Sequence, residues 1–392
     1  MNKSNPKTSS DNYDVVVVGA GFSGMYLVKK LRDLGLNFVI LEQGGDVGGT
    51  WYWNRYPGAR CDIPTVEYSY SFDKELEQSW DWQELMAAQP EILTYANQVA
   101  DNYDLRDSMR FNTRVASADF DENEHSWTLV TDTGDEYLAR YFIMATGCLS
   151  VPNWPDIEGR EDYAGRTIHT GLWPHEKVDF TGLRVGIIGT GSSAVQSIPE
   201  IAKTAKELKV FQRTPVYTFP AGNHPLDDDF RADIKARYED IRETQRGSLG
   251  GMAMFGVMGR LQEVGTEKIA DCSEEEREQR LVEEGLPSLR RYADVGLDLE
   301  ANEMACDLYR RHIADIIDDP ETAKALMPRG YPMGCKRQVV DIGYYEAFNR
   351  DNVSLIDLRE DPIERINESG VCTAGGQHDV DVLIYATGFD AM

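Results

Sequence analysis

Two glycine-rich segments of the chain have the residue types and spacing that bind dinucleotides. The first, residues 19–24 (GAGFSG), follows an apolar run at residues 15–18. Its glycines permit a tight turn and let backbone N–H groups approach a pyrophosphate, and the helix that follows adds its positive end. Glu42 comes directly after the next apolar run, where a carboxylate can accept hydrogen bonds from a ribose diol. We therefore expect a dinucleotide at this segment.

The second segment, residues 189–194 (GTGSSA), repeats the motif after an apolar run at residues 184–188. Here Arg213, and not an acid, follows the next run at residues 208–211. A guanidinium at this position can pair in a forked geometry with a 2′-phosphate, which favours NADP(H) over NAD(H). The alternative is an ordinary surface arginine after a strand.

Two further stretches carry candidate chemistry. Residues 48–62 (GGTWYWNRYPGARCD) are rich in aromatic residues, glycine and proline, which predicts an irregular loop whose rings could pack against a planar cofactor. Residues 330–337 (GYPMGCKR) form a turn-rich run that ends in two adjacent cations, Lys336 and Arg337. The alternatives are ordinary loop packing for the first stretch and a solvated cation pair for the second.

Two βαβ units must position these residues. Apolar runs predict buried strands at residues 15–18, 38–41, 141–144, 184–188 and 208–211, with helices after both glycine loops and over residues 81–104. The apolar run at residues 380–385 ends in an Ala-Thr-Gly sequence, as does the one at 141–144, and such strands mark crossings between two nucleotide domains. Residues 221–330 are acidic and have a helical pattern. The predicted fold is α/β, with two Rossmann-like domains and a helical insertion.

Composition limits the classes of partner. The chain has 392 residues and a formal net charge of −27, which argues against nucleic acid and against anionic membrane surfaces as partners. No stretch approaches the roughly 20 apolar residues of a membrane span. The six cysteines are scattered without a CxxC pair, which argues against a zinc site or a disulfide reductase and favours a reducing, cytoplasmic location.

These features together resemble the class B flavoprotein monooxygenases. The run from Gly49 to Asp62 matches the motif [AG]GxWxxxx[FY]P[GM]xxxD of type I Baeyer–Villiger monooxygenases, the family of cyclohexanone and phenylacetone monooxygenases. Residues 163–174 resemble the family fingerprint FxGxxxHxxxW[PD], with Tyr163 in place of phenylalanine and His169 at its centre. The resemblance implies an FAD- and NADPH-dependent enzyme that uses O₂ to insert one oxygen atom beside a ketone carbonyl.

The resemblance also implies which residues bind the two cofactors. Those assigned to FAD are Gly19, Gly21, Ser23, Gly24, Glu42, Gly49, Thr50, Trp51, Trp53, Asp62 and Tyr68, and Arg60 and Cys61 are also assigned to cofactor binding. Those assigned to NADP(H) are Gly189, Thr190, Gly191, Ser192, Ser193, Ala194, Val195, Gln196, Arg213, Thr214 and Lys336, and Arg337 is also assigned to cofactor binding.

Arg337 would be the catalytic residue of such an enzyme, oriented by Asp62. A guanidinium stays protonated, so beside a flavin C4a-peroxide it would keep the peroxide anionic and nucleophilic. It would also stabilise the oxyanion of the tetrahedral adduct that forms on the ketone, which gives an ester or lactone. We expect this cation to be buried, with the carboxylate offsetting part of the desolvation cost.

The predicted domain order is a disordered leader at 1–12, the first part of an FAD domain at 13–150, a linker and the first part of an NADP domain at 151–220, the helical insertion at 221–330, the second part of the NADP domain at 331–388, and a return to the FAD domain at 389–392. Family members continue past this point, so the sequence predicts a truncated chain. The alternatives are a monooxygenase that oxidises sulfur or nitrogen, with a sulfide as substrate, and a catalytically incomplete nucleotide-binding fragment. The sequence predicts neither the ketone nor the oligomeric state.

Overall fold

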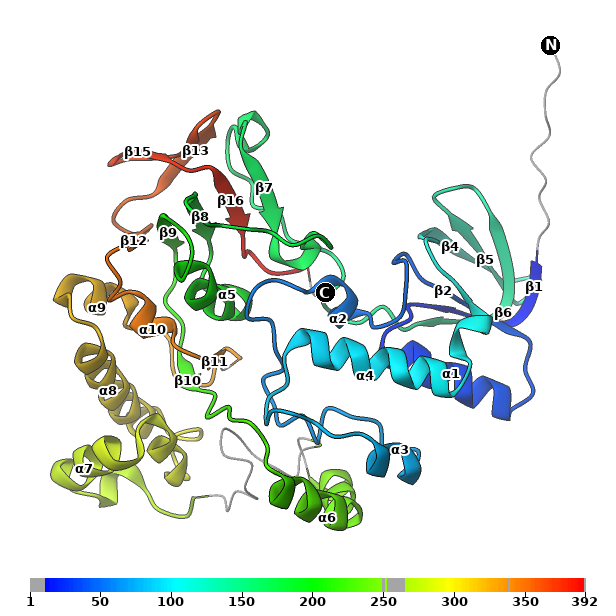
Figure 1. Ribbon diagram of the computed structural model, residues 1–392, viewed down its shortest axis with the longest axis horizontal. Coiled ribbons are helices and arrows are strands. Elements are labelled where there is room, and N and C mark those ends of the chain that lie inside the picture. Colours follow the sequence, from blue (N-terminus) through cyan, green and yellow to red (C-terminus); the bar gives the residue numbers. More distant parts are fainter. Residues whose placement is uncertain (1–10, 249–250, 252–264, 338, 391–392) are drawn as a thin grey trace. The chain divides into compact units, whose positions relative to one another are not determined.

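The structure is a computed structural model that describes residues 11–248, 251, 265–337 and 339–390. These residues form two compact units (Figure 1). The first unit lies within Met1–Arg55, Pro90–Pro152 and Phe389–Met392, and the second comprises Tyr56–Gln89 and Asn153–Gly388. Residues 56–89 thus belong to the second compact unit. The sequence places them in the predicted FAD domain, and that domain division stays a prediction. Most of the predicted leader lies outside the described residues, and residues 11 and 12 begin the first strand.

The first unit is built on a six-stranded sheet with the order β3-β2-β1-β6-β5-β4. The first four strands in this order are parallel neighbours, and the last two add an antiparallel edge. Two helices, α1 (Phe22–Asp33) and α4 (Gln89–Asn102), accompany the sheet. The strands are β1 (Asp11–Val18), β2 (Phe38–Leu41), β3 (Met109–Arg110), β4 (Val115–Asp121), β5 (Ser126–Thr131) and β6 (Glu136–Met144).

The strand–loop–helix–strand order predicted for residues 15–42 is confirmed. Val16 and Val17 of β1 are fully buried, as a continuous β-branched run predicts for a strand covered on both faces. The buried side of α1 is formed by Met25, Val28 and Leu31, which follow helical spacing. The first glycine loop therefore joins a buried strand, β1, to a helix with one buried face, α1.

Two local predictions are wrong. Residues 81–88 are not helical: Leu85 N–H donates to His224 O at 3.0 Å, Thr65 N–H donates to Leu85 O at 2.7 Å, and the helix begins only at Gln89, beside Pro90. Backbone pairing with distant segments overrides the helical pattern of this stretch. Residues 50–53, predicted as irregular loop, form one helical turn, α2 (Thr50–Trp53).

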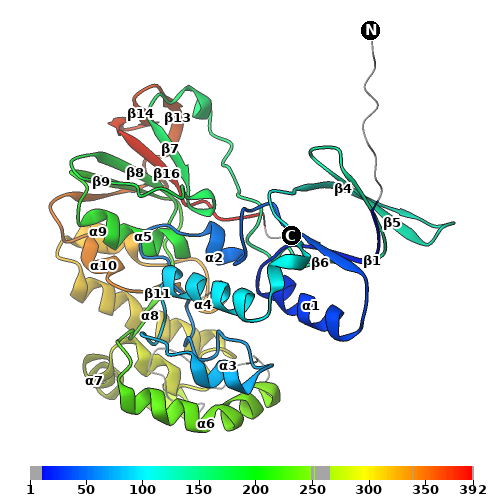
Figure 2. The same ribbon diagram turned by 45° about the vertical axis from the view of Figure 1, so that its right-hand side comes forward.

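The second unit contains a five-stranded parallel sheet with the order β12-β9-β8-β16-β7 (Figure 2). The helix after the second glycine loop, α5 (Ser192–Ala202), buries Val195, Ile198 and Ile201 in the main hydrophobic core. The strand β16, the last one in the described residues, lies between β8 and β7. The strands of this sheet are β7 (Arg166–His169), β8 (Arg184–Ile188), β9 (Glu207–Gln212), β12 (Val353–Asp357) and β16 (Val382–Tyr385).

Smaller elements complete this unit. A parallel pair joins β10 (Thr218–Pro220) to β11 (Val339–Asp341), and an antiparallel sheet contains β13 (Ile363–Asn367), β14 (Gly370–Thr373) and β15 (Gly376–Asp379). The helices besides α5 are α3 (Lys74–Ser79), α6 (Asp228–Gly247), α7 (Glu274–Glu284), α8 (Leu299–Ile316), α9 (Pro320–Leu326) and α10 (Tyr344–Ala347). The helical insertion predicted from the sequence therefore contains α6, α7, α8 and α9.

Side-chain caps define where these helices begin. Asp227, Asp298 and Asp319 each accept a backbone N–H at the start of α6, α8 and α9. Ser273 and Glu276 form a reciprocal capping box at α7. Each cap binds a donor no more than three residues away, so local sequence fixes where these helices begin.

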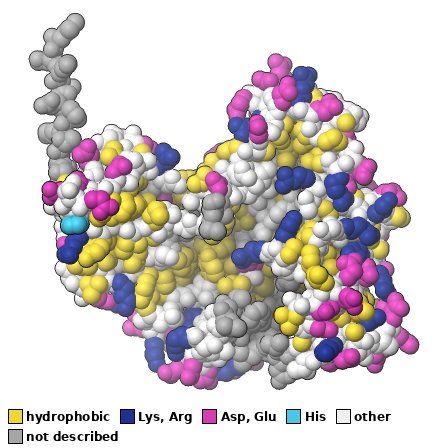
Figure 3. All heavy atoms as spheres, turned by 180° about the vertical axis from the view of Figure 1, so that it is seen from behind, with side chains coloured by type: hydrophobic (Ala, Val, Ile, Leu, Met, Phe, Trp, Pro, Cys, Tyr) yellow, Lys and Arg dark blue, Asp and Glu magenta, His cyan; other side chains and the backbone are white. Residues whose placement is uncertain are grey.

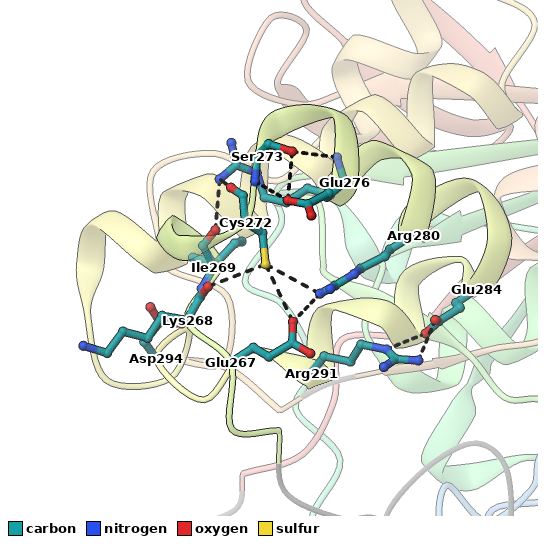
Figure 4. Close-up of polar contacts among 11 residues, drawn as sticks. Glu267, Lys268, Ile269, Cys272, Ser273, Glu276, Arg280, Glu284, Arg291 and Asp294 are labelled. Atoms are coloured by element: carbon teal, nitrogen blue, oxygen red, sulfur yellow. Dashed lines mark hydrogen bonds and ion pairs between the residues drawn. The ribbon is translucent and has the colours of Figure 1, made fainter.

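A polar cluster fixes α7 to the segments on either side of it. Figure 4 shows the thiol of Cys272 between the carboxylate of Glu267, at 3.7 Å, and the guanidinium of Arg280, at 3.6 Å. Arg280 also pairs with Glu267, and Arg291 pairs with Glu284. Burial raises the pKa of the Cys272 thiol, so the thiol is neutral at physiological pH and the cluster reads as structural.

The surface of the first unit carries exposed apolar side chains. Figure 3 shows such side chains gathered on this unit, and Phe120, Tyr141 and Met144 are exposed by 41%, 53% and 73%. Of the helices in the described ranges, none has both the length and the hydropathy that a bilayer crossing requires. Within the same ranges, no group of three or more His, Cys, Asp or Glu side chains is arranged to hold a metal ion.

A buried ion pair joins α6 to α3. Arg242 Nε donates to Glu77 Oε1 at 2.7 Å, and both side chains are only 7% exposed. The same guanidinium donates to Ser69 Oγ at 2.8 Å and to Gln245 Oε1 at 2.9 Å. Three partners thus satisfy one buried cation, and residues 69–77 are fastened to the helical insertion.

Replacing Arg242 by alanine would leave the Glu77 carboxylate buried without its cation. We expect Arg242→Ala to lower the free energy of unfolding by about 3–5 kcal/mol, measured by thermal and urea unfolding. The control is Lys324→Ala, because Lys324 and Glu321 form a pair in which both side chains are more than 70% exposed, and such pairs contribute about 0–1 kcal/mol. Equal, small effects of the two substitutions would contradict the importance of the buried pair.

Candidate functional site

The first glycine loop has the close packing that its sequence predicts. A Cβ atom on Gly24 would lie 1.9 Å from the carbonyl oxygen of Gly19, so only glycine fits where α1 approaches the loop. Helix α1 begins at Phe22, and within the described residues no side chain caps its N-terminus. Its first N–H groups therefore remain available to an anion.

Glu42 organises the backbone around this loop. Its side chain is buried, and its carboxylate accepts Ala20 N–H and Gly44 N–H, each at 2.7 Å. The segment after it folds back as well, because Gly48 N–H donates to Ala20 O at 3.1 Å. A carboxylate has about four acceptor positions, so the predicted bonds to a ribose diol remain compatible with this geometry.

The other residues of this unit assigned to FAD differ in exposure. Trp51 is 7% exposed, so its ring is largely covered by protein. Thr50 and Trp53 are half-buried, and the Trp53 ring meets Tyr52 edge-on at 5.1 Å. Ser23 is exposed in the first turn of α1. Ser23, Thr50 and Trp53 thus present surface to a ligand, whereas Trp51 mainly supports the loop.

The second glycine loop repeats the geometry of the first. Gly189 has a φ of +111°, and a Cβ atom there would lie 2.5 Å from Ala386 O. No side chain among the described residues caps α5. Thr190 Oγ1 donates to Thr214 O at 2.9 Å, which ties the loop to the segment after β9. Ala194 and Val195 are buried in the core, so they would meet a coenzyme only through their backbone.

Gln196 holds residues 56–60 against α5. The Tyr56 hydroxyl donates to Gln196 Oε1 at 3.0 Å, and Gln196 Nε2 donates to Arg60 O at 3.2 Å. The buried amide is therefore engaged with protein, which differs from the predicted role as a coenzyme ligand. The 56–60 segment, which leads to Asp62, is the part of the chain that it fixes.

The remaining residues of this segment have separate surroundings. Arg60 pairs with Glu84 at 2.9 Å. Burial raises the pKa of the Cys61 thiol to about 12, so it is a neutral core residue and not a nucleophile. Tyr68 is half-buried. Arg60, Cys61, Asp62 and Tyr68 belong to the second unit, whereas the first glycine loop belongs to the first.

Asp62 and Arg337 form the predicted pair, although they lie far apart in sequence. Arg337 Nε donates to Asp62 Oδ2 at 2.9 Å, and Nη2 bonds the same oxygen. The Arg337 side chain is 72% exposed and that of Asp62 is 26% exposed. The expectation of a buried cation is therefore wrong in this structure, because the turn that carries Arg337 lies on the surface of the second unit.

Two further cations of this unit lie at its surface. Arg213, directly after β9, and Lys336 are both exposed, and within the described residues neither forms an ion pair. The Lys336 ammonium lies over the Tyr331 ring, 4.4 Å from its centroid. The sequence assigned no role to Tyr331 or to Asn302. The tertiary structure shows that Tyr331 contacts Lys336 and that Asn302 contacts the 331–337 loop at Met333.

His169, at the centre of the fingerprint, joins the segments that cross between the units. Its Nδ1 accepts Gly171 N–H at 3.0 Å, and its Nε2 lies 3.3 Å from Thr387 Oγ1. The Thr387 hydroxyl also bonds Asn153 O. The histidine is 1% exposed and its ring packs against Trp154 at 4.9 Å. Its contacts are those of a positioning residue.

The chain is similar to known proteins along almost its whole length. The family described as "Pyridine nucleotide-disulphide oxidoreductase" matches residues 16–253. A protein named "Baeyer-Villiger monooxygenase" from Pseudooceanicola batsensis is 42% identical over 99% of this chain and 71% of its own length. The chain belongs to the Baeyer–Villiger monooxygenase family. A "Cyclohexanone 1,2-monooxygenase" from Acinetobacter sp. is also 42% identical, over 97% of the chain and 70% of its own length.

Solved structures of Baeyer–Villiger monooxygenases have the same fold. A structure described as "OTEMO complex with FAD and NADP" superposes with a TM-score of 0.89 at 39% identity, over 98% of this chain and 72% of the other. The family resemblance and the predicted α/β fold with two Rossmann-like domains are confirmed. Membership favours the oxygen-insertion reading over a disulfide reductase.

The surroundings of His169 predict a pH dependence of stability. Burial lowers the pKa of His169, so the folded protein keeps this ring neutral while the unfolded chain takes up a proton as the pH falls through the usual histidine value of about 6.5. Stability is therefore lost as the pH falls from about 7 toward the folded-state pKa. We expect His169→Asn, which retains an acceptor, to show a weaker loss. Parallel thermal-midpoint profiles of the variant and the parent from pH 7.5 to 5.5 would refute this.

Proposed function

We propose that this chain is an FAD- and NADPH-dependent monooxygenase that inserts one atom of O₂ beside a ketone carbonyl, giving an ester or lactone. The observation that carries the proposal is the pairing of Asp62 with Arg337 across 275 positions of sequence. Family membership supplies the reaction class, and the two glycine loops supply the binding sites for its two cofactors.

The residues present fit both dinucleotides. Among the described residues, no side chain caps α1 or α5. Each helix follows a glycine turn in which a Cβ atom, on Gly19 or on Gly189, would lie 2.5 Å from a carbonyl oxygen, which suits two pyrophosphates. In the first unit Glu42 would hold a ribose of FAD. In the second unit Arg213 and Lys336 would bind the 2′-phosphate of NADP(H). The bound flavin would supply the redox centre that reacts with O₂.

The role of Arg337 follows from its charge and its free donors. A guanidinium has five N–H donors and Asp62 engages two of them, so three remain for a reacting oxygen. Because it does not lose its proton, Arg337 would favour an anionic nucleophile and stabilise the oxyanion that develops on the substrate carbonyl. Asp62 would fix the plane of the guanidinium. An exposed pair of this kind contributes little stability.

The substrate is proposed to be a small ketone, with sulfide or amine oxidation as the alternative chemistry. We also propose a cytoplasmic location, which is supported by six free cysteines. The test of the reaction is product analysis with FAD, NADPH and O₂ on a panel of cyclic ketones, aryl ketones, sulfides and amines. Ester or lactone formation is the expected result. Formation of hydrogen peroxide as the sole product with every ketone would contradict the proposal.

Replacing Arg337 by alanine should separate the two halves of the reaction. We expect Arg337→Ala to keep NADPH oxidation, with hydrogen peroxide as its product, while ester formation falls by about 10²–10³-fold, which is the typical loss on removal of an oxyanion-stabilising group. The control is Arg329→Ala, an exposed arginine in the same region. Ester formation at the parent rate would refute the catalytic role.

Glu42 should govern retention of the flavin. We expect Glu42→Gln to bind FAD about tenfold more weakly, because an amide offers one acceptor oxygen to the two backbone donors and lacks the charge. The measurement is the ratio of flavin to protein after dialysis, with titration of FAD into apoprotein. Glu136→Gln, at an exposed position at the start of β6, is the control. Unchanged FAD affinity would contradict this placement.

A further inference from the structure

Three segments of the second unit converge beside the second glycine loop. Thr190 of the glycine loop donates to Thr214 O at 2.9 Å. From the other side, the Tyr331 hydroxyl donates to Pro215 O at 2.6 Å. The short segment 213–215, which begins with Arg213, is therefore fixed by the glycine loop and by the 331–337 loop. These contacts place the two loops on neighbouring residues of one segment.

Tyr331 connects this segment to Lys336. The Lys336 ammonium lies 4.4 Å from the centroid of the Tyr331 ring, within the distance at which a cation is attracted to an aromatic face. Burial raises the pKa of Tyr331 to about 12, so its hydroxyl stays protonated and donates to Pro215 at physiological pH. One aromatic side chain thus contacts the backbone next to Arg213 and Thr214 and also the second cation.

The Tyr331 ring is itself held in place. Tyr217 packs edge-on against it at 5.3 Å, and the Tyr217 hydroxyl lies 3.4 Å from Tyr331 O. Two residues later, Asn302 of α8 clamps Met333: it accepts Met333 N–H and donates to Met333 O, both at 2.9 Å. Asn302 is 5% exposed. The loop is anchored by the helical insertion before it reaches Lys336.

The charges at this place differ from those of the rest of the chain. The protein has 67 acidic and 40 basic residues, and many of its arginines and lysines pair with carboxylates. Within the described part of the chain, Arg213 and Lys336 have no carboxylate partner, yet both lie close to Tyr331 or to the segment it binds. Two cations without counter-ions on an acidic protein suit a doubly charged anion.

We propose that Tyr331 is a positioning residue for coenzyme choice: its ring holds the Lys336 ammonium beside the segment that carries Arg213, so that both cations meet one ribose 2′-phosphate. The inference rests on the proposed function, because it names how the NADP(H) site distinguishes NADPH from NADH. Tyr331 acts through Lys336 and does not itself touch the phosphate.

The experiment compares binding of 2′,5′-ADP with that of 5′-AMP, by calorimetry on the flavin-loaded protein, together with kcat/KM for NADPH and for NADH. Tyr331→Leu removes the ring and the hydroxyl, and Tyr331→Phe removes only the hydroxyl. Each is also made together with Lys336→Met. The control is Tyr26→Leu, which removes another tyrosine beneath a lysine, Lys30, at 5.5 Å in the first unit. Thermal unfolding checks that each variant folds.

We expect Tyr331→Leu to lower the preference for 2′,5′-ADP about fivefold and Tyr331→Phe about twofold, with 5′-AMP binding unchanged. In the Lys336→Met background the tyrosine substitutions should have no further effect on this preference. Parent-like preference in folded Tyr331→Leu, or an equal loss in the Lys336→Met background, overturns the inference. If Tyr331→Leu does not fold, the inference is decided by comparing Tyr331→Phe in the parent protein with Tyr331→Phe in the Lys336→Met background. A parent protein without any preference for 2′,5′-ADP overturns the NADP(H) part of the proposed function, and the inference with it.

Discussion

The pairing of Asp62 with Arg337 is the interaction that several buried contacts of the second unit hold in position. An exposed ion pair contributes about 0–1 kcal/mol, so the pair cannot hold its own partners in place. Other contacts do that work: Gln196 fixes the segment before Asp62 through Tyr56 and Arg60, and Asn302 fixes the loop before Arg337. Buried amides set the position of an exposed charge, which stays accessible to a reacting ligand.

The helical insertion has a corresponding role. Its Asn302 contacts the loop that carries Lys336 and Arg337. Its Arg242 contacts residues 69–77, which follow Asp62 in the sequence. The insertion therefore contacts both chain segments that provide the Asp62–Arg337 pair. Two of its buried polar side chains, those of Arg242 and Asn302, make these contacts. Changes inside the insertion would reach the candidate site through these groups.

Much of the fold was predictable because the deciding interactions are local. The valine run of β1, the glycine loops and the caps of α6 to α9 are all encoded within a few residues. Residues 81–88 could not be predicted, since their extended form depends on pairing with residues near 61–65 and 224. The Asp62–Arg337 pair followed from a family motif, but the exposure of Arg337 and the roles of Asn302 and Tyr331 depend on contacts that no local pattern records.

The position of β16 in the sheet has a consequence for biosynthesis. This strand lies between β8 and β7, although both of these are made more than 190 residues earlier. Until residues 382–385 emerge, each of these strands has an unpaired edge open to other nascent chains. The sheet of the second unit therefore stays incomplete until these residues have been made, so its precursor is a natural client for chaperones.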